Sequence, residues 1–248
     1  MMQMVRSLLF GLLMFGSVAP YSIALLLVAP FGYDRCYNIA VVWARLIQRG
    51  AKLFCGLDYR VVGKEHIPAG AAVYMLKHSS AFETILELLI FPRQTWVLKR
   101  ELTLIPIFGW ALHYLRPIAI DRRRGRNAVR SVVEQGKQAL TDGTNVMIFP
   151  EGTRVQHGLT RKYGLSGFVL AGEAGVTIVP VAHDAGRFWP RRGIHKKPGT
   201  VSFIIGEPIV MGAREPRAVA REVQTWIEEQ LRELDAGTHP ALASDVEV

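Results

Sequence analysis

The sequence opens with a long stretch that carries no charge, and this stretch limits what the rest of the chain can be. Residues 7–33 contain no Asp, Glu, Lys or Arg, which gives 27 residues, enough to cross a bilayer as a helix. Pro20 divides the run into two shorter parts. Two interpretations follow: one kinked helix that spans the bilayer, or a short hairpin that enters one leaflet. A cleaved signal peptide is disfavoured because no small-residue cleavage site followed by a polar segment is evident.

Basic residues lie mainly on one side of this run. Arg6 alone precedes it. Four basic residues follow it closely, namely Arg35, Arg45, Arg49 and Lys52. This excess predicts that the main domain lies on the cytoplasmic side of a bacterial-type inner membrane. Residues 36–54 carry apolar side chains on one helical face, so residues 1–55 are predicted to be a helical, membrane-associated segment.

The composition indicates a folded chain with an anionic partner. The 248 residues are 50% hydrophobic, which excludes a disordered or low-complexity chain. Lys and Arg number 30 against 21 Asp and Glu, and the net charge of +9 favours nucleic acid, a membrane surface or a phosphorylated substrate. Cys36 and Cys55 are too few for a disulfide framework, and no Cys/His spacing indicates a zinc site.

After the apolar segment, short β-rich runs alternate with helical patterns. The expected strands cover residues 59–62, 72–76, 95–98, 118–120, 145–149, 177–181 and 201–205. The expected helices cover residues 82–90, 126–141, 164–173 and 216–234. This alternation predicts an α/β domain over residues 56–235, with a central mixed sheet covered by helices, and residues 236–248 are predicted to be a disordered tail. In such sheets, ligands bind beyond the carboxyl ends of the strands.

The first candidate for chemistry follows an expected buried strand and reads Lys77-His78-Ser79-Ser80-Ala81-Phe82-Glu83. A turn at this point could bring the Glu83 carboxylate to the His78 imidazole, fix its tautomer and make it a general base. The alternative is structural, because Ser80 and Glu83 also have the spacing of a capping box at the start of a helix. On spacing alone both readings stay open.

The second candidate is the run Phe149-Pro150-Glu151-Gly152-Thr153-Arg154. An apolar strand leads directly into this turn, where Pro150 ends the strand and Gly152 permits a close backbone approach or a positive φ. Arg154 stands where a guanidinium could bind a phosphate. The alternative is an ordinary turn with a solvated Glu151–Arg154 pair.

Two further basic groups follow strand ends. Lys99 and Arg100 come directly after one expected strand, and Asp121-Arg122 comes after another. Each group by itself is typical of a solvated loop, although on a membrane protein the second could also contact anionic headgroups. Polar groups at four strand ends are what one convergent site would produce.

Taken together, these motifs resemble the 1-acylglycerol-3-phosphate acyltransferases of the glycerolipid acyltransferase family. The resemblance covers residues 70–210 and the apolar N-terminus. Residues 149–154 match the family's FPEGTR block in full, and the segments around Lys99-Arg100-Glu101, Ile120-Asp121-Arg122 and Val179-Pro180-Val181 match other blocks in order. The family's first block is His-x4-Asp, and here Glu83 replaces the Asp, so the geometry must accommodate one more methylene.

The resemblance implies acyl transfer from an acyl thioester to the sn-2 hydroxyl of 1-acylglycerol-3-phosphate, which yields phosphatidic acid. His78 would be the general base and Glu83 would orient it. Arg154, Lys99, Arg100 and Arg122 would hold the phosphate, with Glu151, Gly152 and Thr153 shaping that pocket. The expected partners are the lysophosphatidic acid, an anionic membrane surface, and acyl-CoA or acyl carrier protein as co-substrate, with no further cofactor and no metal.

Several other functions are weighed against this reading. A serine hydrolase is disfavoured because the nearest string to Gly-x-Ser-x-Gly, residues 164–168, breaks the pattern. A nucleic-acid-binding protein would explain the charge but not the apolar run. A non-catalytic membrane-binding relative remains an alternative, with the basic-aromatic loop of residues 187–197 as its contact surface. Within the enzyme class, another lysolipid or glycerol-3-phosphate could be the acceptor. His183-Asp184 is expected to be a structural pair, since no other His/Asp cluster has spacing that fits a metal phosphohydrolase.

Overall fold

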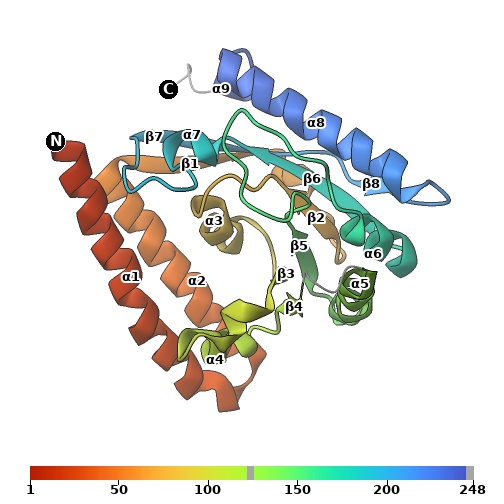
Figure 1. Ribbon diagram of the computed structural model, residues 1–248, viewed down its shortest axis with the longest axis horizontal. Helices are drawn as coiled ribbons and strands as arrows, with labels where there is room; N and C mark the ends of the chain where they lie inside the picture. Colours follow the sequence, from red (N-terminus) through yellow and green to blue (C-terminus); the bar gives the residue numbers. More distant parts are fainter. Residues whose placement is uncertain (122–125, 244–248) are drawn as a thin grey trace.

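Two long helices form the N-terminal part of the chain. The computed structural model describes residues 1–121 and 126–243. Helix α1 (Met2–Val28) continues through Pro20, and a 3-10 turn, η1 (Ala29–Phe31), leads into α2 (Tyr33–Gly50) and the π-helical turn η2 (Ala51–Cys55). Gly32 has φ +102° between η1 and α2, a conformation that glycine adopts readily. The two helices pack against each other along one side of the molecule (Figure 1).

The central sheet is mixed, as the sequence predicts. Its strands are β1 (Leu57–Val62), β2 (Val73–Leu76), β3 (Gln94–Lys99), β4 (Ile118–Ile120), β5 (Asn145–Ile148), β6 (Thr177–His183), β7 (Gly199–Ile205) and β8 (Ile209–Val210). They lie in the order β1-β7-β6-β2-β5-β3-β4, with β8 paired to β6. Strands β6, β2, β5, β3 and β4 are mutually parallel, whereas β7 is antiparallel to β6 and parallel to β1. The parallel part places five carboxyl ends on one edge.

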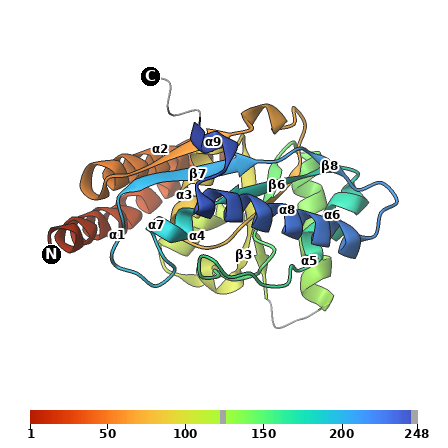
Figure 2. The ribbon, with the colours of Figure 1, turned by 90° about the horizontal axis from the view of Figure 1, so that it is seen from above.

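Helices cover both faces of this sheet. They are α3 (Phe82–Ile90), α4 (Phe108–His113), α5 (Arg126–Thr141), α6 (Ser166–Ala174), α7 (Ala185–Phe188), α8 (Pro216–Ala236) and α9 (Pro240–Ala243), with 3-10 turns η3 (Lys64–His66) and η4 (Arg100–Leu104). Because side chains alternate along a strand, Val73 and Met75 of β2 enter one core, while Tyr74 and Leu76 enter the other. The first core contains α5, α6 and α8, and the second contains α3 and parts of α1 and α2. Figure 2 shows α8 extended along the length of the sheet.

The elements expected from the sequence are found within about two residues of their predicted bounds. The periodicity does not reveal the short α4, α7 and β8, whose positions depend on tertiary contacts. The disordered tail was predicted to begin at residue 236, yet α8 reaches Ala236, α9 follows, and His239 between them is buried. For residues 244–248 the structure gives no description, and the division into 1–55 and 56–235 stays a prediction.

Candidate active site

Sequence-predicted residues from several strands gather at the carboxyl edge of the parallel strands. His78 follows β2, Glu151 follows β5, and Lys99 ends β3. Since β2 and β5 are neighbours, His78 and Glu151 meet, whereas β3 lies one strand further along. Adjacent strands are about 4.8 Å apart, so Lys99 starts roughly 10 Å from the β2 line. This edge is therefore where the structure brings candidate residues together.

The His78–Glu83 pair has the geometry of a base and its orienting carboxylate. Nδ1 of His78 lies 2.9 Å from Oε1 of Glu83, whose side chain is fully buried, while the His78 side chain stays 16% exposed. Burial alone would raise the pKa of Glu83, but the hydrogen bond from His78 holds that pKa below its ordinary value. An ionised Glu83 accepts a hydrogen bond from the Nδ1–H of His78, which leaves Nε2 as an acceptor.

The same carboxylate also caps helix α3. Oε1 of Glu83 accepts the backbone N–H groups of Ser79, at 3.0 Å, and Ser80, at 2.9 Å. The Ser80 hydroxyl in turn accepts the N–H of Phe82 at 3.1 Å. The capping reading and the orienting geometry are thus both present in one side chain, and the turn that caps α3 is what presents Glu83 to the imidazole.

The FPEGTR turn is tied to the backbone of His78 on both sides. Oε2 of Glu151 accepts the N–H of His78 at 2.7 Å, and the N–H of Val155 donates to the His78 carbonyl at 2.7 Å. Gly152 has φ +70°, which allows its N–H to close the turn onto the Phe149 carbonyl. The Phe149 ring stacks on the imidazole with centroids 4.1 Å apart. Glu151 therefore contacts the histidine itself, a contact that the sequence reasoning does not foresee.

Among the residues that the structure describes, those predicted to bind the phosphate are not found in contact with His78. Thr153 and Arg154 follow Glu151 in the same turn and are half-buried. Lys99 and Arg100 are exposed at the end of β3 and the start of η4. Arg122 lies outside the described residues. Arg154 thus belongs to the turn that is hydrogen-bonded to His78. Lys99 and Arg100 lie further along the same edge of the sheet.

His183 and Asp184 have structural partners, as the sequence predicts. Nε2 of His183 lies 2.7 Å from the Lys77 carbonyl, and Oδ1 of Asp184 accepts the N–H of Ser202 at 2.9 Å. Burial lowers the pKa of His183, so the ring is neutral and supports the strand end before His78. Within residues 1–121 and 126–243, no group of three or more His, Cys, Asp or Glu side chains could hold a metal ion.

Sequence reasoning missed Lys77, Phe149 and Glu228 as parts of the site. Lys77 and Phe149 belong to the two candidate motifs. The sequence therefore places them near the candidate site but does not predict which atoms they contact. Glu228 lies on α8, where the amphipathic pattern reports only the apolar face. The contacts of Lys77 with Glu151 and Glu228 are therefore information that the fold alone supplies.

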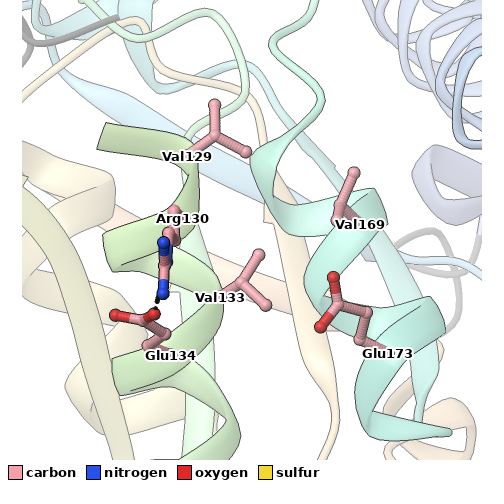
Figure 3. A pocket seen from close by; sticks show the side chains of 6 residues that line it. All are labelled: Val129, Arg130, Val133, Glu134, Val169 and Glu173. Atoms are coloured by element: carbon pink, nitrogen blue, oxygen red, sulfur yellow. Dashed lines mark hydrogen bonds and ion pairs between the residues drawn. The ribbon is translucent and has the colours of Figure 1, made fainter. Parts of the chain in front are cut away.

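Surface pockets elsewhere do not coincide with this edge. One of about 350 Å³ lies between α5 and α6 (Figure 3). It is lined by Val129, Arg130, Val133, Glu134, Val169 and Glu173. Figure 3 shows Arg130 directed to Glu134 on its own helix, with which it forms an ion pair of 2.7 Å. None of the sequence-predicted site residues lines this pocket.

Comparisons with known proteins identify relatives of this chain. A family model described as Acyltransferase matches residues 58–184. A 1-acyl-sn-glycerol-3-phosphate acyltransferase of Pseudomonas aeruginosa is 37% identical over 94% of this chain and 92% of its own length. The human 1-acyl-sn-glycerol-3-phosphate acyltransferase alpha is 32% identical over 55% of this chain and 49% of its own.

A solved structure supports the fold independently. The crystal structure of the 1-acyl-sn-glycerophosphate acyltransferase PlsC from Thermotoga maritima superposes with a TM-score of 0.77. It covers 95% of this chain and 98% of its own at 23% identity, which shows the shared fold. With the relative from Pseudomonas aeruginosa, these matches establish that the chain belongs to the family of 1-acyl-sn-glycerol-3-phosphate acyltransferases.

Proposed function

We propose that the chain transfers an acyl group from an acyl thioester to the sn-2 hydroxyl of 1-acylglycerol-3-phosphate, with His78 as general base. The observation that carries this proposal is the 2.9 Å contact between His78 Nδ1 and the buried Glu83 carboxylate, beside the FPEGTR turn. This contact leaves Nε2 as the ring nitrogen that can accept a proton. The sequence of the motif blocks and the relatives' activity both support the same chemistry.

The reaction balances without a covalent enzyme intermediate. Nε2 of His78 takes the hydroxyl proton as the oxygen attacks the thioester carbonyl, and the C–S bond then breaks. The departing sulfur takes the proton from the imidazolium, so the products are phosphatidic acid (1,2-diacylglycerol-3-phosphate) and a free thiol. Glu83 stabilises the imidazolium between these steps. The thiol carrier is coenzyme A or acyl carrier protein, and the residues alone do not call for another cofactor.

The phosphate of the acceptor is assigned to the basic groups along the edge. Arg154 is adjacent to the turn that binds His78, and its guanidinium can form two parallel hydrogen bonds to a phosphate. Lys99, Arg100 and Arg122 are proposed to extend this positive surface, while Gly152 and Thr153 shape its floor. An acceptor bound at Arg154 would present its hydroxyl toward His78.

The proposed site of action is the cytoplasmic face of the inner membrane. Within the described residues, one helical segment, Met2–Phe31, is long and apolar enough to cross a bilayer. Its ends both contact the domain: Gln3 Nε2 donates to the Lys196 carbonyl, and Leu25 packs with Ala111 of α4. A helix held along the side of the domain favours insertion into one leaflet, parallel to the surface, over a span. Exposed apolar residues of α1 and of the neighbouring segment, Leu12, Phe15, Leu104 and Trp110 among them, fit that placement.

The test is thiol release from acyl-CoA by the protein in lipid, with and without 1-acylglycerol-3-phosphate. His78→Ala should lower the rate by about 10²- to 10⁴-fold, the usual contribution of a general base. His195→Ala, which alters an exposed histidine on the 187–197 loop, serves as the matched control and should behave as wild type.

Other outcomes would contradict parts of the proposal. An unchanged rate of thiol release in His78→Ala would contradict the assignment of His78 as the general base. Release without the lysolipid would indicate a thioesterase, and release with glycerol-3-phosphate or another lysolipid only would change the acceptor. If neither acyl-CoA nor an acyl carrier protein thioester is turned over, the protein is a non-catalytic relative.

A further inference from the structure

The amino group of Lys77, one residue before the proposed base, lies in a buried cluster of oxygens. The Lys77 side chain is 2% exposed. Its Nζ lies 3.0 Å from Oε1 of Glu151, 2.6 Å from Oε1 of Glu228 and 2.9 Å from the Leu159 carbonyl. The ammonium group donates hydrogen bonds to the Glu228 carboxylate and the Leu159 carbonyl, and it lies within ion-pair distance of the Glu151 carboxylate.

Each acceptor comes from a different part of the chain. Glu151 belongs to the FPEGTR turn, Leu159 to the loop that follows it, and Glu228 to helix α8. The end of β2 is thereby joined through one charge to the turn and loop of residues 149–163 and to α8, which are far from it in the sequence. The side chain of Glu228 is 24% exposed, whereas those of Lys77 and Glu151 are buried.

Helix α8 holds the same loop through three more polar contacts, one of which is the hydrogen bond from Gln224 Nε2 to the Arg161 carbonyl at 3.2 Å. Nε2 of Gln224 donates to the Thr160 hydroxyl at 3.0 Å, and His157 Nε2 lies 2.8 Å from Oδ1 of Asp235. Glu228 lies between Gln224 and Asp235 along α8. The loop of residues 155–163 is therefore fastened to one side of the helix, with the Lys77–Glu228 pair as its buried centre.

This fastening reaches the proposed base through the backbone. The carboxylate oxygen of Glu151 that does not face Lys77 accepts the N–H of His78, and Val155 at the start of the loop donates to the His78 carbonyl. A shift of the loop or of Glu151 would consequently move the peptide that carries the imidazole. A buried ion pair adds little to stability by itself, because desolvation offsets the attraction. Its effect here is on placement.

We propose that Lys77 and Glu228 are positioning residues for the acyl transfer. Their ion pair holds the 155–163 loop on α8, and Lys77 holds the Glu151 carboxylate against the peptide of His78. This inference rests on the proposed function for its catalytic consequence, whereas the holding of the loop can be tested without turnover.

Lys77 and Glu228 have opposite effects on the pKa of Glu151, so removing each charge should shift that pKa in the opposite direction. Burial raises the pKa of Glu151 to about 7, with Lys77 opposing the rise and Glu228 adding to it. The buried Tyr163 hydroxyl also interacts with Glu151, and burial raises the pKa of Tyr163, so that it stays neutral. Removing the Lys77 charge therefore moves the titration of Glu151 to higher pH, and removing the Glu228 charge moves it to lower pH.

The experiment compares Lys77→Met and Glu228→Gln by the pH dependence of kcat/KM. The acid limb should move up by about 1–3 pH units in Lys77→Met, as expected for the loss of a contacting opposite charge, and down in Glu228→Gln. The control is Glu229→Gln, the same change one residue along α8, where the side chain is half exposed. Its profile should match wild type. Limbs that stay at the wild-type pH in both variants would overturn the proposal.

Hydrogen exchange of the loop gives a readout that does not need activity. Amides of residues 152–163 should exchange faster in Glu228→Gln than in wild type or Glu229→Gln, including the Val155 N–H that bonds to His78. Equal exchange in the three proteins would contradict the fastening, even where Lys77→Met fails to fold. Faster exchange in a protein whose wild type transfers no acyl group would refute the proposed function and the catalytic role while leaving the loop contact in place.

Discussion

One oxygen of Glu83, Oε1, accepts hydrogen bonds from three donors. A substitution that moves this oxygen therefore affects both the start of α3 and the orientation of His78. Oε1 accepts two backbone N–H groups at the start of α3 and lies against Nδ1 of His78. The sequence leaves capping and orientation as alternatives because each needs only a carboxylate near position 83. The structure shows that the cap brings the carboxylate to the imidazole, so the two geometries come together.

Glu83→Asp should separate the two effects. The carboxylate retreats by about 1.5 Å, one C–C bond, and can no longer meet all three donors. We expect kcat to fall by more than about tenfold, and the weakened cap to cost about 1 kcal/mol of unfolding free energy. Steady-state kinetics and thermal melts measure both, with Glu134→Asp on the exposed face of α5 as control. A lower Tm with unchanged kcat would show that Glu83 only caps.

Glu87, one turn further along α3, makes stability depend on pH. Burial and the charge on Glu83 raise its pKa well above the ordinary value. The folded protein then keeps a proton that the unfolded chain releases above about pH 4.5, so this group's contribution falls as pH rises from there. The Tm of Glu87→Gln should equal that of wild type near pH 4. As the pH rises toward 8, the Tm of the variant should exceed that of wild type by a growing margin. A Tm difference that is constant with pH would contradict this assignment.

At the scale of elements, α1 combines a buried side with a strongly apolar exposed side. Phe10 and Met14 enter the core beside α2, whereas Leu12 and Phe15 are about 71% and 72% exposed. Exposed apolar side chains in this density mark a surface that contacts something other than water. The proposed membrane placement assigns them to the acyl region of one leaflet.

The double variant Leu12→Asp and Phe15→Asp tests that placement. It should lose flotation with vesicles of anionic phospholipid, because two charges would enter the apolar layer. Its Tm should change little, since both side chains are exposed. Val210→Asp, an equally apolar and exposed site on β8, is the control and should float as wild type. Unimpaired flotation of the double variant would contradict the role of α1.

The elements themselves were largely predictable, and for a physical reason. The strands next to the site are short apolar runs that end in Pro, Gly or a charge, and such runs have few alternative structures. Helix α4 was missed because it begins after Ile107, which has φ +63°, a conformation rarely taken by a β-branched residue. Its start depends on contacts with α1 and η4 and not on local pattern.

At the scale of the whole molecule, the site arises from strand order. Parallel pairing of β2 with β5 brings His78 and Glu151 together, although 72 residues separate them in the sequence. The motif order suggested convergence, but no pattern in one sequence specifies which strands are neighbours. The antiparallel pairing of β7 and the Lys77–Glu228 contact are also unpredictable from one sequence, because both depend on the tertiary structure.

The hydrogen bonds that join the start of α1 to the domain have a consequence for motion. Gln3 donates to the carbonyls of Cys55 and Lys196, and the Ser7 hydroxyl accepts the N–H of Lys196. These bonds hold the start of α1 against the loop that contains Lys196. On a bilayer, the height of His78 above the lipid is then set by the fold. The encounter with a lysolipid becomes a search in two dimensions, governed by surface density and lateral diffusion.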